Sequence, residues 1–155
     1  MHMENQLNWT LKTFEELSNE ELYQLLRLRS EVFVVEQNCN FLDMDNKDQQ
    51  CHHLLGWDCG ELMAVARIVP PGISYEFPSI GRIVVSPRGR GRKYGVELVH
   101  KAIQCVDNFY GKGNIRIGAQ LYLKKFYETF HFRQSGSIYL EDNIEHIEMT
   151  RVFNE

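Results

Sequence analysis

The sequence lacks any apolar run near the roughly 18 residues that a membrane-spanning helix needs. Residues 1–5 lack the charged and apolar blocks of a secretory signal peptide. The four cysteines are widely scattered and form no Cys-x-x-Cys pair, so we expect free thiols in a reducing compartment. These absences predict a cytoplasmic protein that has no membrane partner.

The composition is that of an ordinary globular protein. The 155 residues are 43% hydrophobic and 25% charged, and no linker or repeat divides them, so we expect one domain over residues 1–155. The net charge of −4 argues against nucleic acid as a partner. A basic segment at residues 88–93 stands out against this acidic background.

The spacing of apolar residues predicts an alternation of helices and strands. Ser18 and Glu21 form a capping box that begins a helix running to about Glu36. We expect further helices from Gly91 to about Tyr110 and over residues 121–130, and strands at residues 7–13, 51–57, 62–69, 80–86, 115–119, 134–140 and 144–153. This order predicts a mixed-sheet α/β domain.

Two groups of side chains could suggest a metal site, but the first lacks residues that the site requires and the second has its side chains on opposite faces. Asp43, Asp45 and Asp48 lie in a polar loop, but the Gly and Glu that a calcium loop requires at its sixth and twelfth positions are absent. His52 and His53 are adjacent in a predicted strand and would point to opposite faces. We therefore expect no metal cofactor.

The most informative stretch is residues 82–98, where a β-branched run leads through an Arg- and Gly-rich loop into a helical pattern. This order places free backbone N–H groups and a helix N-terminus together, which favours binding of a phosphate. The loop lacks the P-loop spacing, and Gly89-x-Gly91-x-x-x-Gly95 is one residue longer than the dinucleotide motif. A merely solvated basic loop is the competing interpretation.

Residues 90–95 resemble the acyl-CoA loop of the GNAT N-acetyltransferases, whose pattern is [Gln/Arg]-x-x-Gly-x-[Gly/Ala], with Lys93 in place of the first glycine. Residues 119–132 resemble the family segment that ends in Leu-Tyr-Glu-Lys-x-Gly-Phe. Tyr127 stands at the tyrosine of that segment, and Gln120 stands where many members carry an Asn that contacts CoA.

Residues 25–39, together with the acidic loop behind them, resemble the ElaA-like branch of this family. The resemblance covers nearly the whole chain. It implies the GNAT fold, an α/β domain with a mixed, mostly antiparallel sheet that is splayed at the fourth and fifth strands and flanked by helices. It also implies acetyl-CoA as cosubstrate, no metal, and transfer of an acetyl group to the amine of a small molecule or peptide. A homodimer is compatible with it.

The resemblance implies Tyr127 as the general acid that protonates the departing thiolate, since a phenol lies close in pKa to a thiol. Many family members use a Glu near the fourth strand as the base, and that region holds no carboxylate here. Glu36, His52 and His53 are the candidates. The implied CoA-binding residues are Ile83, Val84, Val85, Arg90, Gly91, Arg92, Lys93, Tyr94, Gly95, Val96 and Gln120.

Other functions stay open. An acyl-homoserine lactone synthase shares the implied fold, and a non-catalytic CoA-binding or regulatory module would need no base. A nucleic-acid binder that uses the basic loop is the more distant alternative. On the residues alone, Tyr127 could also be a core aromatic like its neighbours Phe126 and Phe130.

Overall fold

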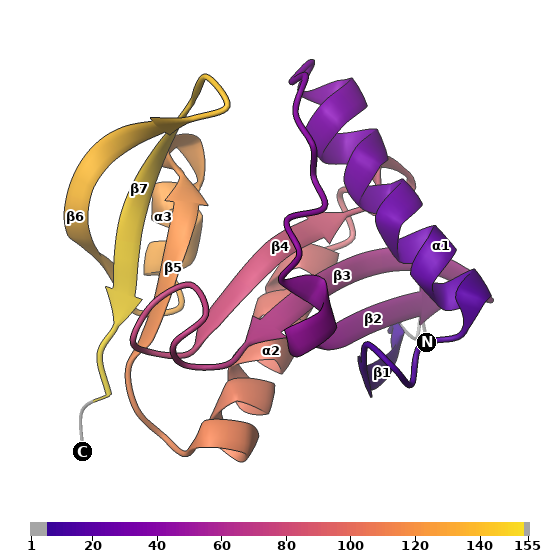
Figure 1. The fold of residues 1–155 in the computed structure, drawn as a ribbon, viewed down its shortest axis with the longest axis horizontal. Coiled ribbons are helices and arrows are strands. Elements are labelled where there is room, and N and C mark those ends of the chain that lie inside the picture. Colours follow the sequence, from indigo (N-terminus) through magenta and orange to yellow (C-terminus); the bar gives the residue numbers. More distant parts are fainter. Residues whose placement is uncertain (1–5, 154–155) are drawn as a thin grey trace.

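The computed structural model describes residues 6–153 and contains two antiparallel sheets that lie side by side (Figure 1). The first sheet has the order β1 (Asn8–Thr13), β2 (His52–Asp58), β3 (Glu61–Val69), β4 (Ser79–Val85), and the second has β5 (Ile115–Gln120), β7 (Ile144–Arg151), β6 (Phe132–Glu141). The helices are α1 (Asn19–Arg29), the π-helix η1 (Ser30–Glu36), α2 (Tyr94–Tyr110), α3 (Lys124–Glu128) and the short 3₁₀ turns η2 (Asp48–Gln50), η3 (Pro87–Gly89) and η4 (Leu121–Leu123). Within this described part, no helix is both long and apolar enough to cross a membrane.

The two sheets touch at one end of β4 and β5 and separate toward the other. The N–H of Arg116 donates to the carbonyl of Pro78 over 3.1 Å, close to where both strands begin. The strands then run in the same direction and diverge (Figure 1). Among residues 6–153 no ladder joins them. The predicted splay between the fourth and fifth strands is therefore confirmed.

The first helix begins and ends where the sequence predicts, but its last two turns are wound differently. The Ser18 hydroxyl accepts from the N–H of Glu21 over 3.1 Å, and the Glu21 carboxylate accepts from the N–H of Ser18 over 2.8 Å. From Ser30 to Glu36 the chain is a π-helix, in a segment rich in β-branched residues that favour α-helix weakly. The widened turns end at the opening between the sheets.

The second helix starts three residues later than expected. Gly91 and Lys93 have φ angles of 84° and 62°, so the chain cannot be helical until Tyr94. Lys93 thus occupies a left-handed conformation that a glycine adopts at lower cost. The GNAT motif has a glycine at this position. The left-handed backbone that favours a glycine is present here, although the residue is Lys93.

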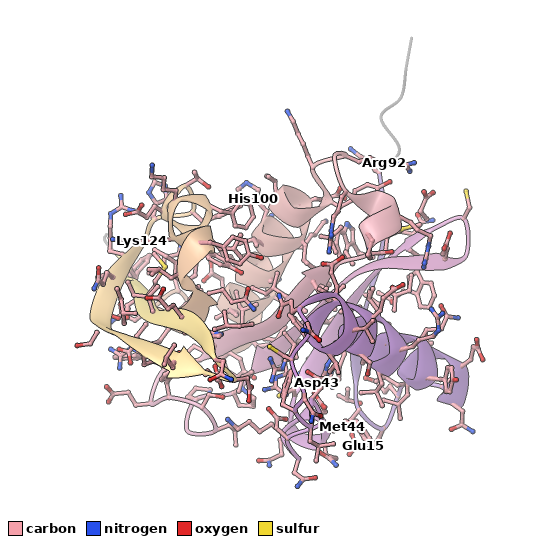
Figure 2. The ribbon with its side chains drawn as sticks, turned by 90° about the horizontal axis from the view of Figure 1, so that it is seen from above. Glu15, Asp43, Met44, Arg92, His100 and Lys124 are labelled. Carbon is pink, nitrogen blue, oxygen red and sulfur yellow. The ribbon has the colours of Figure 1, made fainter. Side chains whose placement is uncertain are left out.

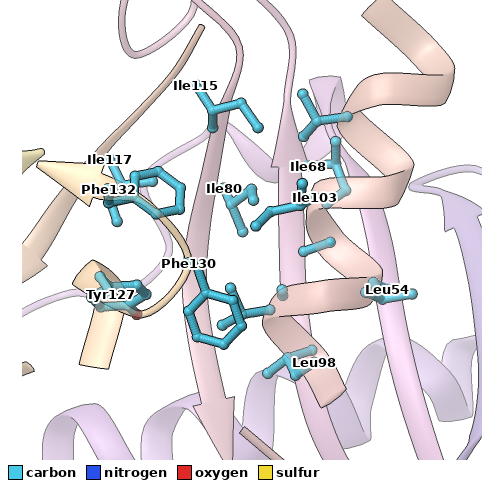
Figure 3. Packing of buried hydrophobic residues seen from close by; sticks show 14 of the residues in the cluster. Leu54, Ile68, Ile80, Leu98, Ile103, Ile115, Ile117, Tyr127, Phe130 and Phe132 are labelled. Carbon is cyan, nitrogen blue, oxygen red and sulfur yellow. The ribbon is translucent and has the colours of Figure 1, made fainter. Parts of the chain in front are cut away.

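Two apolar clusters hold the layers together. One lies between the first sheet and α1 and contains Leu25, Val65 and Val84. The larger one lies on the opposite face, under α2 and α3, and extends to the second sheet (Figure 3). Figure 3 shows Ile80 and Leu98 in this cluster together with Phe130 and Phe132. Each fully buried side chain of this size contributes about 1.5–3 kcal/mol.

A network of buried ion pairs fixes the acidic loop. Arg29 has an exposed fraction of 0%. Its Nε lies 2.8 Å from Oδ2 of Asp43, and its Nη1 lies 2.8 Å from Oδ1 of Asp48. Arg67 connects the same Asp48 carboxylate, over 3.1 Å, with that of Asp45, over 2.6 Å. The aspartates that faintly resembled a calcium loop thus neutralise two buried arginines.

The buried imidazole of His53 gives folding a dependence on pH. Its Nε2–H donates to the carbonyl of Asp48 over 2.8 Å, and burial lowers the pKa of His53 from its usual value. Below about pH 6.5 the unfolded chain binds a proton at this residue that the folded protein resists, so the free energy of unfolding falls. We expect His53→Gln to reduce this loss by up to about 1.4 kcal/mol per pH unit.

The measurement is urea unfolding at several pH values between 5 and 8. His52→Gln is the matched control, since His52 is the adjacent residue and is only half-buried against Phe109. Equal pH slopes for the wild type and His53→Gln would contradict the assignment.

Candidate active site

A cavity of about 470 Å³ lies where β4 and β5 diverge. Its walls come from η1, β4, the first turn of α2, β5, the η4–α3 segment and β7. The volume is in the range of small-molecule sites. The splay therefore creates a binding space between two edges of sheet that do not pair with each other.

The cavity brings together part of the predicted site. Of the predicted residues, those that line it are Glu36, Ile83, Val84, Val85, Arg90, Gly95, Gln120 and Tyr127. The remaining predicted residues, Gly91, Arg92, Lys93, Tyr94 and Val96, form the adjoining loop and helix start. The side chain of Tyr94 is buried in the core with an exposed fraction of 2%, so it has no room to contact a ligand. The groups of this turn that could bind a ligand are therefore its backbone N–H groups.

A bulge in β4 directs neighbouring side chains of this strand to opposite faces of the sheet. The ladder with β3 shifts register here, and Arg82 has a φ of 48°. The guanidinium of Arg82 lies 5.2 Å from the ring centroid of Phe33 and 3.3 Å from Oδ1 of Asp43, on the α1 face. Ile83 packs into the cluster on the α2 face. The bulge leaves peptide groups outside the ladder, where a ligand in the cavity can reach them.

The cations of the basic segment at residues 88–93 are close in the sequence, but their side chains do not converge on one point. Arg88 Nε lies 2.5 Å from the Glu61 carboxylate, and Arg92 lies 3.5 Å from that of Asp58. Figure 2 shows Arg92 at the edge of the molecule, far from Asp43. Each arginine is drawn toward a different carboxylate because the acidic background supplies partners all around the loop.

The end of η1 bridges the cavity opening. Arg90 and the Glu36 carboxylate form a bidentate pair with distances of 2.6 and 2.9 Å. This hydrogen-bonded guanidinium lowers the pKa of Glu36, which makes the carboxylate a weaker base. Two further contacts follow along the chain, the paired amides of Gln37 and Gln120 and the thiol of Cys39 with the carbonyl of Asp142.

Tyr127 lines the cavity and has an exposed fraction of 5%. Its ring meets those of Phe126 and Phe132 edge to face, with centroids 5.2 and 6.1 Å away. Figure 3 shows it beside Phe132 and Ile117. Burial raises the pKa of Tyr127, so the phenol stays protonated in neutral solution. It is both a core aromatic and a cavity residue.

His52 and His53 do not line the cavity. His52 stacks on Phe109 with a centroid distance of 4.2 Å, and His53 is enclosed beside the acidic loop. The reason is topological, because β3 lies between their strand and β4. Neither imidazole is placed to act on a molecule in the cavity.

The structure adds one histidine that sequence reasoning missed. His146 lines the cavity from β7, with an exposed fraction of 9%. The alternation of its strand, with Ile147 and Met149 buried, indicates that His146 faces the other way. Its neighbour across the sheet is Gln120, and that pairing depends on a register between distant segments that the sequence does not reveal.

Within residues 6–153 no three His, Cys, Asp or Glu side chains are grouped closely enough to hold a metal ion. The four cysteines are free thiols.

Comparison with known proteins identifies the family. The model of the acetyltransferase (GNAT) domain matches residues 15–153. Protein ElaA of Escherichia coli (strain K12) is 40% identical over 147 residues, which is 94% of this chain and 96% of ElaA.

Solved structures agree with this assignment. An acyl-CoA N-acyltransferase from Pseudomonas aeruginosa has a TM-score of 0.90 and 38% identity, and Escherichia coli ElaA has a TM-score of 0.87 and 39% identity. Each comparison covers 94% of this chain and 99% of the other. BjaI, a CoA-dependent acyl-homoserine lactone synthase solved with SAM and isopentyl-CoA, shares the fold at 16% identity, with a TM-score of 0.75 over 96% of this chain and 83% of its own. The chain belongs to the GNAT acetyltransferase family, in its ElaA-like branch.

Proposed function

We propose that this protein is an acyl-CoA-dependent N-acetyltransferase that moves an acetyl group from acetyl-CoA to the amine of a small molecule or peptide. The observation that carries the proposal is the cavity at the splay, because it joins the unpaired edge of β4, the start of α2 and the buried phenol of Tyr127 in one space. We also propose that the protein is cytoplasmic, that nucleic acid and membranes are not its partners, and that a homodimer is its candidate assembly.

CoA would lie along the cavity with its phosphates at the loop. The N–H groups of residues 91–96 and the positive end of α2 favour a pyrophosphate at this point. The backbone of Ile83, Val84 and Val85 would pair with the pantetheine amides as an added strand, since within residues 6–153 no strand pairs with this edge of β4 along the splay. The thioester would then lie near Tyr127.

The reaction forms one C–N bond and breaks one C–S bond. The neutral amine attacks the thioester carbon, a base takes the proton that the nitrogen loses, and the departing thiolate takes a proton from Tyr127. The products are the amide and the free thiol of CoA. Holding the thioester in a narrow cavity favours the attack by orientation.

Gly95→Ala tests the binding mode. A Cβ at Gly95 would lie 3.7 Å from Phe126 and 3.8 Å from Val85, so the folded protein has room for it, and alanine loses less backbone entropy than glycine when the helix forms. The methyl group would project into the cavity where we place CoA. We expect unchanged or higher thermal stability and a dissociation constant for CoA that is at least about tenfold higher, a loss of about 1.4 kcal/mol.

Calorimetric titration with CoA measures this affinity, and Gly113→Ala is the control because a Cβ there meets nothing within 4 Å. Unaltered CoA affinity in Gly95→Ala would refute the proposed position of the cofactor.

Turnover is then followed as thiol release from acetyl-CoA with lysine, spermidine and benzylamine. CoA binding without transfer to any amine would indicate a regulatory module, and lactone formation would indicate a synthase.

A further inference from the structure

We propose that His146 is the general base of this reaction, and this proposal rests on the transferase function proposed above. The candidates from the sequence are unsuitable, because Glu36 is held by Arg90 and the histidines of β2 lie outside the cavity. His146 is a buried imidazole in the cavity wall. Three features of its surroundings fit the role.

The first feature is the face of the sheet on which it lies. Ile147 and Met149 belong to the same apolar cluster as Tyr127, on the α2 and α3 side of the second sheet. Adjacent residues of a strand alternate, so His146 lies on the opposite side, paired with Gln120. The acid and the base would therefore approach the thioester from opposite faces of the splay. This suits a reaction in which the amine enters from one side and the thiolate leaves toward the other.

The second feature is the tautomer. Nδ1 of His146 lies 2.8 Å from the carbonyl oxygen of Ile144. A carbonyl only accepts, so Nδ1 carries the hydrogen, and the lone pair of the neutral ring is on Nε2. The backbone of its own strand thereby holds the ring in the form that can accept a proton at Nε2.

The third feature is the charge around the ring. Nε2 lies 3.5 Å from Oε2 of Glu141, so a carboxylate faces the nitrogen that would take up the proton. Tyr139 stacks on the ring at 5.6 Å, and burial raises its pKa to about 12, so it stays neutral. Glu148, two residues further along the same strand, lies 3.6 Å from Arg116. The carboxylate of Glu141 is thus the charge that acts directly on His146.

The proposed reaction moves two protons, one from the amine to His146 and one from Tyr127 to the sulfur. Nε2 of His146 takes one proton from the amine nitrogen as the C–N bond forms. As the C–S bond breaks, its electron pair goes to sulfur, which takes the phenolic proton of Tyr127. The imidazolium then releases its proton to water, and the phenolate regains one from water. No oxidant, metal or further reactant is needed.

The test compares His146→Gln with the wild type, using acetyl-CoA and the best of the three amines named above. We expect kcat to fall by about 100-fold, with the affinity for CoA and the thermal stability unchanged. The acid limb of the kcat/KM profile, which reports protonation of the base, should disappear. Imidazole in the buffer should restore part of the activity of His146→Ala, which leaves space for it.

His100→Gln is the control, because His100 is an exposed histidine on α2 (Figure 2). Full activity of a folded His146→Gln, or an unchanged acid limb, would overturn the role of His146 and leave the transferase function standing. A wild-type protein that binds CoA and acetylates none of the amines would overturn the function itself, and the base with it. The two failures are thus distinguishable.

Discussion

Tyr127→Phe should lower kcat for acetyl transfer by about 100-fold or more and leave the affinity for CoA unchanged. The substitution removes one hydroxyl and keeps the ring that packs against Phe126 and Phe132, so the fold should persist. Without the phenolic proton the thiolate must leave unprotonated, or wait for a proton from water. The effect should therefore fall on the chemical step.

Because burial raises the pKa of Tyr127, the wild-type phenol stays protonated up to at least about pH 10. Loss of its proton should therefore contribute nothing to the pH–rate profile between pH 6 and 9. Tyr122→Phe is the matched control, since Tyr122 also lines the cavity but is 74% exposed. Equal turnover by Tyr127→Phe and the wild type would rule out a role for this phenol as the acid.

Asp48→Asn should be the most destabilising of the conservative substitutions proposed for this chain. The carboxylate of Asp48 contacts both Arg29 and Arg67, and all three side chains are at most 8% exposed. Removing its charge leaves two guanidinium groups in the interior with one carboxylate fewer. Breaking such a buried pair costs about 3–5 kcal/mol. Chemical denaturation measures the loss as a shift of the unfolding midpoint at constant slope.

Glu76→Gln is the exposed counterpart, since Glu76 is 74% exposed and lies 3.8 Å from Arg116. It should change stability by less than about 1 kcal/mol. Similar losses for both variants would mean that the interior network contributes no more than a surface pair.

The buried network also reaches the cavity, because Asp43 connects it to Arg82 in the cavity wall. Asp48→Asn is therefore also expected to weaken binding in the cavity.

The pair between Arg90 and Glu36 would bear on how CoA enters the cavity in the proposed function. The pair is about half exposed, with side-chain exposures of 49% and 41%, so it contributes little to stability. It joins the end of η1 to the loop in which we place the pyrophosphate. A phosphate at the loop would compete with Glu36 for the guanidinium, and the released carboxylate at the cavity opening would still be a weaker base than an imidazole.

Much of the fold could be predicted because its signals are local. The capping box at Ser18 and Glu21 begins α1 as expected, and the apolar spacing after Gly91 predicted α2 to within a few residues. The family motifs placed Tyr127 and the loop in one site, and both adjoin the cavity. The π-helical end of α1 was not predictable, since its apolar residues also fit an ordinary helix.

The sequence by itself determined the order of elements, the family and the position of the basic loop, because caps, periodicity and motif spacing are properties of neighbouring residues. Only the tertiary structure decided which carboxylate each arginine binds and which histidine faces the cavity. No pattern in the sequence around His53 or His146 indicates which of the two lines the cavity. One is enclosed beside Asp48 and the other is placed across from Gln120, because strand order and register join segments that are far apart in the chain.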